Sequence, residues 1–199
     1  SAFWGLLGLW FIIVVYIYFD IAYQLKFFEA SIIWYNITVL GMQFYHVVYY
    51  IPLLTGLVLG ITQYVPEITD KRLKLTLHLP VNESKMLLTM SGIGSIMLLI
   101  IYAFSLILLI SVSSHYFAKE ITYSMLSTIL PWYLAGLILY FSTSMIILEP
   151  IWKRRILYTP IILGFVSLLM EDKYYNLYDN SLIKFAIIAI FFFFGVLIT

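Results

Sequence analysis

The residue types that most often carry catalysis or metal binding are few and scattered in this sequence. Its three histidines, His46, His78 and His115, lie far apart, and none belongs to an HExxH or similar zinc-binding spacing. The absence of cysteine excludes disulfides and thiolate metal sites. Neither a P-loop nor a GxSxG motif is present, so we expect this chain to bind no ATP, metal or other cofactor itself. Polar side chains gather instead in residues 67–85, EITDKRLKLTLHLPVNESK.

The composition indicates what surrounds this polar segment. Of the 199 residues, 63% are hydrophobic and 11% are charged, and the mean hydropathy is +1.02. A water-soluble domain of this size needs more polar surface, so we predict that lipid surrounds most of the chain. The net charge of +1 gives no reason to expect a nucleic-acid partner. Because the chain begins with Ser1 inside an apolar run, we expect that native residues before it are missing.

Six apolar runs approach the roughly 20 residues that a helix needs to cross a bilayer. The period-2 alternation of transmembrane barrel strands is missing from these runs. We therefore predict an all-α polytopic membrane protein with a single transmembrane domain over residues 1–199. The predicted spans are 2–19, 43–64, 88–113, 125–148, 156–170 and 182–199.

The distribution of basic residues orients these spans. Seven of the eleven basic residues fall in the connections 65–87 and 149–155, and the positive-inside rule places such connections in the cytoplasm. Both chain termini are then expected in the cytoplasm as well. The seven residues are Lys71, Arg72, Lys74, Lys85, Lys153, Arg154 and Arg155.

Residues 20–42 are too apolar for an ordinary loop, yet Lys26 and Glu29 make them unsuitable as a span. We predict an interfacial stretch on the outer side that leads into a long, tilted second span. The alternative is a separate crossing over residues 31–50, which would reverse the orientation of the first span.

The interiors of the predicted spans carry essentially no charged residues, which disfavours an ion or proton pathway. Gln43 and His46 form the main polar pair in an apolar setting, and we expect them to make interhelical hydrogen bonds rather than a substrate site. Gly56 and Gly60 have the small-xxx-small spacing that predicts close packing of two helices.

Residues 67–85 have two interpretations. As a basic cytoplasmic loop, the segment would only determine topology. Its ends favour a short charged helix instead, because Pro66 suits a first helical turn and Pro80 would end the element. Glu67 and Asp70 would then lie near the positive end of the helix dipole. A capped helix between two spans is typical of a docking element.

The run from Glu67 to Pro80 resembles the segment that follows the second span in type 2 ABC transporter permeases. Six spans with cytoplasmic termini agree with that family over the whole chain. The resemblance implies that the segment is a coupling helix on a separate ATPase subunit, which would bind ATP and Mg. It also implies a second permease copy or homologue and a location in a bacterial inner membrane. The residues that the resemblance assigns to coupling are Glu67, Asp70, Lys71, Arg72, Lys74, Leu75, Leu79 and Pro80.

Two features depart from the family pattern. The family usually begins with an amphipathic elbow helix, whereas this sequence starts inside the first span, and Asp70-Lys71-Arg72 stands where the family often has small residues. Leucines also fall on two sides of the expected helix, which suits an element packed between the membrane bundle and an ATPase groove.

The expected function is that of a permease subunit in an ATP-driven transporter, not that of an enzyme. Apolar and aromatic spans favour a hydrophobic or amphipathic cargo. We expect a second cytoplasmic contact at Trp152, Lys153, Arg154 and Arg155. The alternative is that these residues only determine the topology. The alternative function is a non-transporting assembly or anchoring subunit of a larger membrane complex.

Overall fold

The computed structural model describes residues 2–28, 30–69, 83–170 and 182–196, and every regular element in these ranges is a helix. The prediction of an all-α protein is therefore confirmed. The elements are α1 (Ala2–Phe27), α2 (Ala30–Thr38), the 3-10 helix η1 (His46–Val48), α3 (Ile51–Thr69), α5 (Glu83–Tyr116), α6 (Lys119–Leu148), α7 (Trp152–Leu169) and α8 (Leu182–Gly195).

Four of the described helical stretches are long and apolar enough to cross a membrane. They are α1, the stretch His46–Thr69 that contains α3, the part Lys85–Tyr116 of α5, and α6. α7 has 18 residues but three basic residues in its first turn, and α8 is a shorter apolar helix of 14 residues. At a rise of about 1.5 Å per residue, α7 and α8 are about 27 Å and about 21 Å long, against a hydrocarbon core of about 30 Å. The four longer stretches indicate a helical membrane protein.

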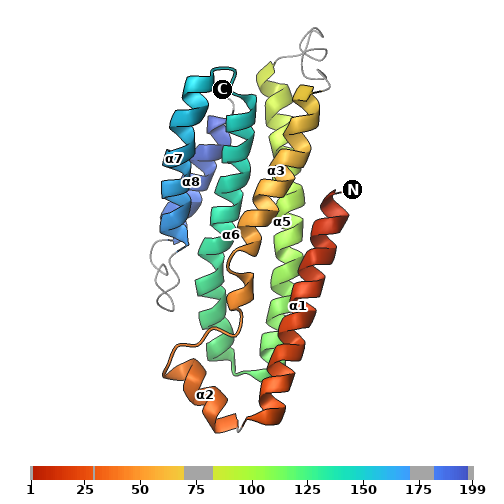
Figure 1. Ribbon diagram of the computed structural model, residues 1–199, viewed down its shortest axis with the longest axis vertical. Helices are drawn as coiled ribbons and strands as arrows, with labels where there is room; N and C mark the ends of the chain where they lie inside the picture. Colours follow the sequence, from red (N-terminus) through yellow and green to blue (C-terminus); the bar gives the residue numbers. More distant parts are fainter. Residues whose placement is uncertain (1, 29, 70–82, 171–181, 197–199) are drawn as a thin grey trace.

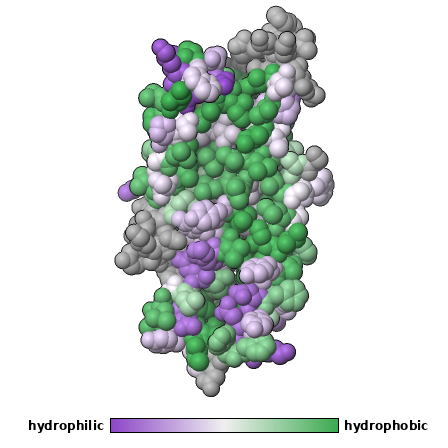
Figure 2. Space-filling model, viewed as in Figure 1, coloured by the Kyte–Doolittle hydropathy of each residue, from purple (hydrophilic) through white to green (hydrophobic). Residues whose placement is uncertain are grey.

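The long helices lie side by side along the long axis of the molecule, and α2 lies across its lower end (Figure 1). The central element is α6, which contacts α3, α5, α7 and α8, whereas α1 packs against α5 and α3. The end of α3, the start of α5 and the α6–α7 turn lie at the upper end, and α1 starts and α8 ends toward that end (Figure 1). Apolar side chains cover most of the middle of this face, while hydrophilic ones appear at the upper tip and in the lower third (Figure 2).

The closest helix packing in the bundle is between α3 and α6. A Cβ at Gly56 would overlap the backbone oxygen of Gly136, and a Cβ at Gly60 would lie 3.0 Å from the Thr143 Cβ. A residue larger than glycine at position 56 would push the two helices apart, whereas at position 60 it would meet the Thr143 side chain at a tight distance. The predicted close packing at Gly56 and Gly60 is confirmed, and α6 is the partner helix.

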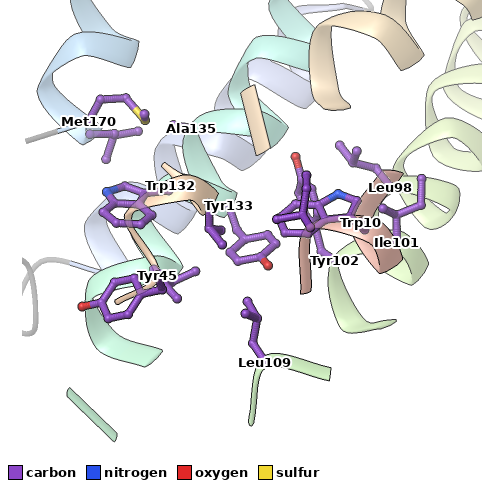
Figure 3. Close-up of a cluster of buried hydrophobic side chains, with 14 of the residues drawn as sticks. Trp10, Tyr45, Leu98, Ile101, Tyr102, Leu109, Trp132, Tyr133, Ala135 and Met170 are labelled. Carbon is purple, nitrogen blue, oxygen red and sulfur yellow. The ribbon is translucent and has the colours of Figure 1, made fainter. Parts of the chain in front are cut away.

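An aromatic cluster joins α1, α5 and α6 beside the contact between α3 and α6, called the α3–α6 seam below. The Trp10 ring stacks on Tyr133 with centroids 5.7 Å apart, and the Tyr102 ring meets Tyr133 edge-on at 4.6 Å. Buried polar atoms in the cluster are hydrogen-bonded: Trp10 Nε1 donates to Thr55 Oγ1 at 3.1 Å, and the Tyr102 hydroxyl donates to the Pro52 carbonyl at 2.9 Å. Figure 3 shows these rings converging from three helices. Apolar contact and hydrogen bonds together connect α1 and α5 to the α3–α6 pair.

The helix that contains the first predicted span is longer than the predicted residues 2–19. α1 continues through residues 20–27 to Phe27, because these residues contain no helix breaker and Gln24 Nε2 donates to Asp20 Oδ2 at 2.9 Å within one turn. The alternative crossing over 31–50 is not realised, since α2 has 9 residues and η1 has 3. This region instead forms a short helix and a turn at the lower end.

The connection predicted over 65–87 is shorter than expected, because α3 continues to Thr69 and α5 begins at Glu83. Pro66 lies inside α3, where it removes one backbone hydrogen bond without ending the helix. Glu67 therefore lies in the last turn of α3, and its predicted position in the first turn of a new helix is wrong. α5 and α6 likewise begin before the predicted residues 88 and 125.

Candidate functional site

Most of the predicted coupling segment lies outside the described residues, namely Asp70, Lys71, Arg72, Lys74, Leu75, Leu79 and Pro80. Glu67 is described and is half-buried in the last turn of α3. The structure therefore shows how the two ends of this segment join the bundle, through α3 before it and α5 after it (Figure 1).

Glu67 continues the side of α3 that faces α6. Gly56, Gly60, Gln63 and Glu67 follow one another at intervals of three or four residues, so they share one side of the helix. The two glycines contact α6, and Gln63 makes the next contact toward the upper end. A displacement of α3 at Glu67 would therefore act along the α3–α6 seam.

Gln63 connects three helices near this end of the bundle. Its Nε2 donates to the Met90 carbonyl of α5 at 2.7 Å, and the Tyr140 hydroxyl of α6 donates to its Oε1 at 2.8 Å. Gly94 leaves room for this arrangement, because a Cβ there would overlap both the Tyr140 hydroxyl and the Gln63 Oε1. In an apolar environment these bonds compete with little water, so they resist separation of α3, α5 and α6.

The α6–α7 turn is held by a buried carboxylate and an arginine. Glu149 is 1% exposed, and its Oε1 accepts a hydrogen bond from the Ile151 backbone N–H at 3.3 Å and lies 3.7 Å from the Arg154 guanidinium. Arg155 donates to the carbonyls of Glu149 at 2.6 Å and Ile147 at 3.2 Å. These carbonyls belong to the end of α6, so Arg155 caps that helix where positive charge is favourable.

The four residues predicted for a second cytoplasmic contact therefore differ in how far their side chains are exposed. Trp152 is 68% exposed, and Lys153 and Arg154 are exposed, whereas Arg155 is partly buried against α6. α7 begins at Trp152, before the predicted residue 156, so all four form its first turn. Trp152, Lys153 and Arg154 are thus accessible to a partner at the upper end.

Replacing Arg155 by Leu is expected to lower the free energy of unfolding by about 1 kcal/mol, because the last carbonyls of α6 lose a charged donor in a partly exposed site. Equilibrium unfolding of the purified chain in mixed micelles measures this change. Lys153→Leu is the matched control, since Lys153 is exposed in the same turn. Equal loss in both variants would contradict the capping role of Arg155.

A cavity with several polar side chains in its lining, at the opposite end, was missed by the sequence-based analysis. It measures about 190 Å³ and lies between the end of α1, α2 and the residues before α3. Gln43 and His46 line it together with Asp20, Gln24 and Asn36, so their side chains meet at a cavity. Gly41, with φ of 66°, allows the chain to reverse after α2 and return over α1. The i, i+4 spacing of Asp20 and Gln24 was the available signal, but it became visible only once α1 extended past residue 19.

The remaining titratable groups do not suggest a metal centre. Within the described ranges, no three His, Cys, Asp or Glu side chains come together to hold a metal ion. His46 lies in η1, His115 lies in the last turn of α5, and His78 lies outside the described residues. Comparison of the whole chain with protein-family models, curated proteins and solved structures finds no match.

Proposed function

We propose that this chain is the membrane-spanning subunit of an ATP-driven transporter of the type 2 ABC permease kind. In this proposal α7 and α8 also cross the membrane, giving six spans with both termini in the cytoplasm of a bacterial cell. The subunit pairs with a second permease copy or homologue, and separate ATPase subunits bind ATP and Mg. The alternating directions of α1, α3, α5, α6, α7 and α8 support six spans (Figure 1).

The observation that carries this proposal is the path from Glu67 into the bundle. Residues 70–82 connect two helices, α3 and α5, that are both hydrogen-bonded through Gln63. The same side chain accepts a hydrogen bond from Tyr140 of the central helix α6. A force applied to residues 70–82 by an ATPase would therefore reach α3, α5 and α6 together.

The exposed residues at the α6–α7 turn provide a second surface for the same ATPase. Trp152, Lys153 and Arg154 belong to the first turn of α7, which begins at the end of the bundle where α3 ends and α5 begins (Figure 1). Closure of the ATPase subunits on ATP would press on both surfaces and shift the bundle between inward-open and outward-open states. The cargo is hydrophobic or amphipathic in this proposal, because the outer faces of the long helices are apolar and no charged path crosses the described part of the bundle.

The proposal is tested by purifying the chain from its native host with its associated proteins. We expect a P-loop ATPase to co-purify, and the ATPase turnover to fall in Glu67→Ala and Arg72→Ala complexes because the transmitting contact is weakened. Thr69→Ala is the matched control, since Thr69 is exposed in the same last turn of α3 and its hydroxyl bonds only to the Val65 carbonyl of its own helix.

Two results would overturn the proposal. One is the absence of any ATPase from the purified assembly, and the other is an ATPase turnover that is the same in all four proteins. Either result would favour the alternative of a non-transporting assembly or anchoring subunit.

A further inference from the structure

The cavity at the lower end is unusual because it gathers polar side chains in a largely apolar protein. Asp20 and Gln24 come from the last turns of α1, Asn36 comes from α2, and Gln43 and His46 come from the chain that returns toward α3. The cavity of about 190 Å³ could hold about six water molecules at roughly 30 Å³ each, or a ligand of similar size. Its lining includes residues of α2. α2 lies at the lower end of the bundle (Figure 1), which is where a membrane helix meets the polar interface.

The carboxylate of Asp20 in the cavity lining favours a cationic ligand. Asp20 is half-buried, and its Oδ2 accepts a hydrogen bond from Gln24 Nε2 at 2.9 Å. In the part of the chain that the structure describes, the ion pair present is Arg154–Glu149, and Asp20 is not in an ion pair. Lys26 shares an open groove on the other side of Asp20 and does not line the cavity. The Asp20 carboxylate can still accept a further hydrogen bond, and a cationic ligand in the cavity would supply a charge-assisted one.

The other lining groups favour an organic ammonium group over a metal ion. Asn36 and Gln43 present carboxamides, whose oxygens accept hydrogen bonds from N–H donors. The rings of Phe44 and Phe117 lie 4.7 Å apart between centroids and form an apolar part of the lining, against which the carbon chain of an organic ammonium can pack. Among the described residues, no three His, Cys, Asp or Glu side chains come together here to hold a metal ion.

We propose that this cavity binds a primary alkylammonium group, with Asp20 as its counter-ion. The group could belong to a small free amine or to the headgroup of an aminophospholipid, because both carry the same N–H donors and positive charge. The ammonium lies between Asp20 and the carboxamides, and its carbon chain lies against Phe44 and Phe117. This site does not depend on the transport function proposed above.

The test uses the full chain in nanodiscs of phosphatidylglycerol, a lipid without an amine. Ethanolammonium chloride is the probe for a free amine, ethylene glycol is the uncharged control, and saturation-transfer NMR measures binding. In a second arm, nanodiscs contain phosphatidylethanolamine and phosphatidylglycerol in equal amounts, and native mass spectrometry measures which lipid remains on the protein.

We expect saturable binding of ethanolammonium, selective retention of phosphatidylethanolamine, or both. Asp20→Asn should weaken binding about tenfold or more, because the charge-assisted hydrogen bond is lost while the shape and the Gln24 bond are kept. Glu120→Gln is the matched control, since Glu120 is an exposed carboxylate at the start of α6 and lies outside the cavity. If Asp20→Asn fails to fold, Asn36→Ala should still weaken binding by removing one acceptor.

Retention of phosphatidylethanolamine without binding of free ethanolammonium assigns the site to the lipid headgroup, and the reverse assigns it to a soluble amine. The proposal is overturned if neither probe binds saturably. It is also overturned if Asp20→Asn or Asn36→Ala binds as tightly as the unaltered chain, or if Glu120→Gln weakens binding equally.

Discussion

Gly56→Ala is expected to lower the free energy of unfolding by about 3 kcal/mol, at the upper end of the range for overpacking a protein interior. The added methyl group would overlap the backbone oxygen of Gly136, and a backbone atom cannot move aside as the tip of a side chain can. The α3–α6 seam would have to open along its length, which would also weaken the contacts of Gly60. Titration of the micelle-bound protein with SDS, followed by circular dichroism, measures the change.

Gly92→Ala is the matched control for this prediction. Gly92 lies within α5, and a Cβ added there would meet no atom within 4 Å. We expect Gly92→Ala to leave the free energy of unfolding unchanged or to raise it by up to about 1 kcal/mol, because alanine favours a helix over glycine. Similar losses in the two variants would show that α3 and α6 do not pack at Gly56.

Gln63→Leu is expected to lower the free energy of unfolding by about 1.5 kcal/mol and to weaken the effect of the chain on its ATPase. The Met90 carbonyl keeps its bond within the α5 helix, but the Tyr140 hydroxyl loses its Gln63 acceptor in an apolar setting. In the proposed complex, loss of this bridge should reduce ATPase turnover about fivefold, which corresponds to about 1 kcal/mol of coupling free energy.

Thr62→Val is the control for Gln63→Leu. It removes a polar group from the same part of α3 without removing the hydrogen bonds of Gln63. Thr62 precedes Gln63 in α3, is exposed, and donates its hydroxyl only to the Val58 and Leu59 carbonyls of its own helix. We expect it to change neither the unfolding curve nor the turnover of the complex. Unaltered turnover in Gln63→Leu would contradict transmission through Gln63, even if the bundle were less stable.

Much of the helical architecture could be predicted because it follows from hydropathy and local spacing. Apolar runs indicated each of the long helices, and the interval between Gly56 and Gly60 indicated a close helix contact. The helix ends were predicted less well. Pro66 was interpreted as a boundary, yet α3 continues past it to Thr69, so the packing of this helix in the bundle offsets the cost of the lost hydrogen bond.

The sites were harder to predict because their residues are distant in sequence. Gln63, Met90 and Tyr140 meet only after three helices have packed, and nothing near any one of them indicates the other two. Arg155 looked like one of several equivalent cytoplasmic cations, but the α6–α7 turn brings it to the carbonyls that end α6. Chain reversal at Gly41 likewise brings Gln43 and His46 to the cavity that Asp20 lines.

The sequence by itself indicated a helical membrane protein, because its apolar runs are long enough to cross a bilayer and a helix satisfies its own backbone hydrogen bonds. Only the tertiary structure decided which polar side chains share a site. Those contacts depend on the rotation and register of each helix against its neighbours. Rotation and register are set by packing at positions such as Gly56, Gly94 and Gly136, which lie far along the chain from the groups that they bring together.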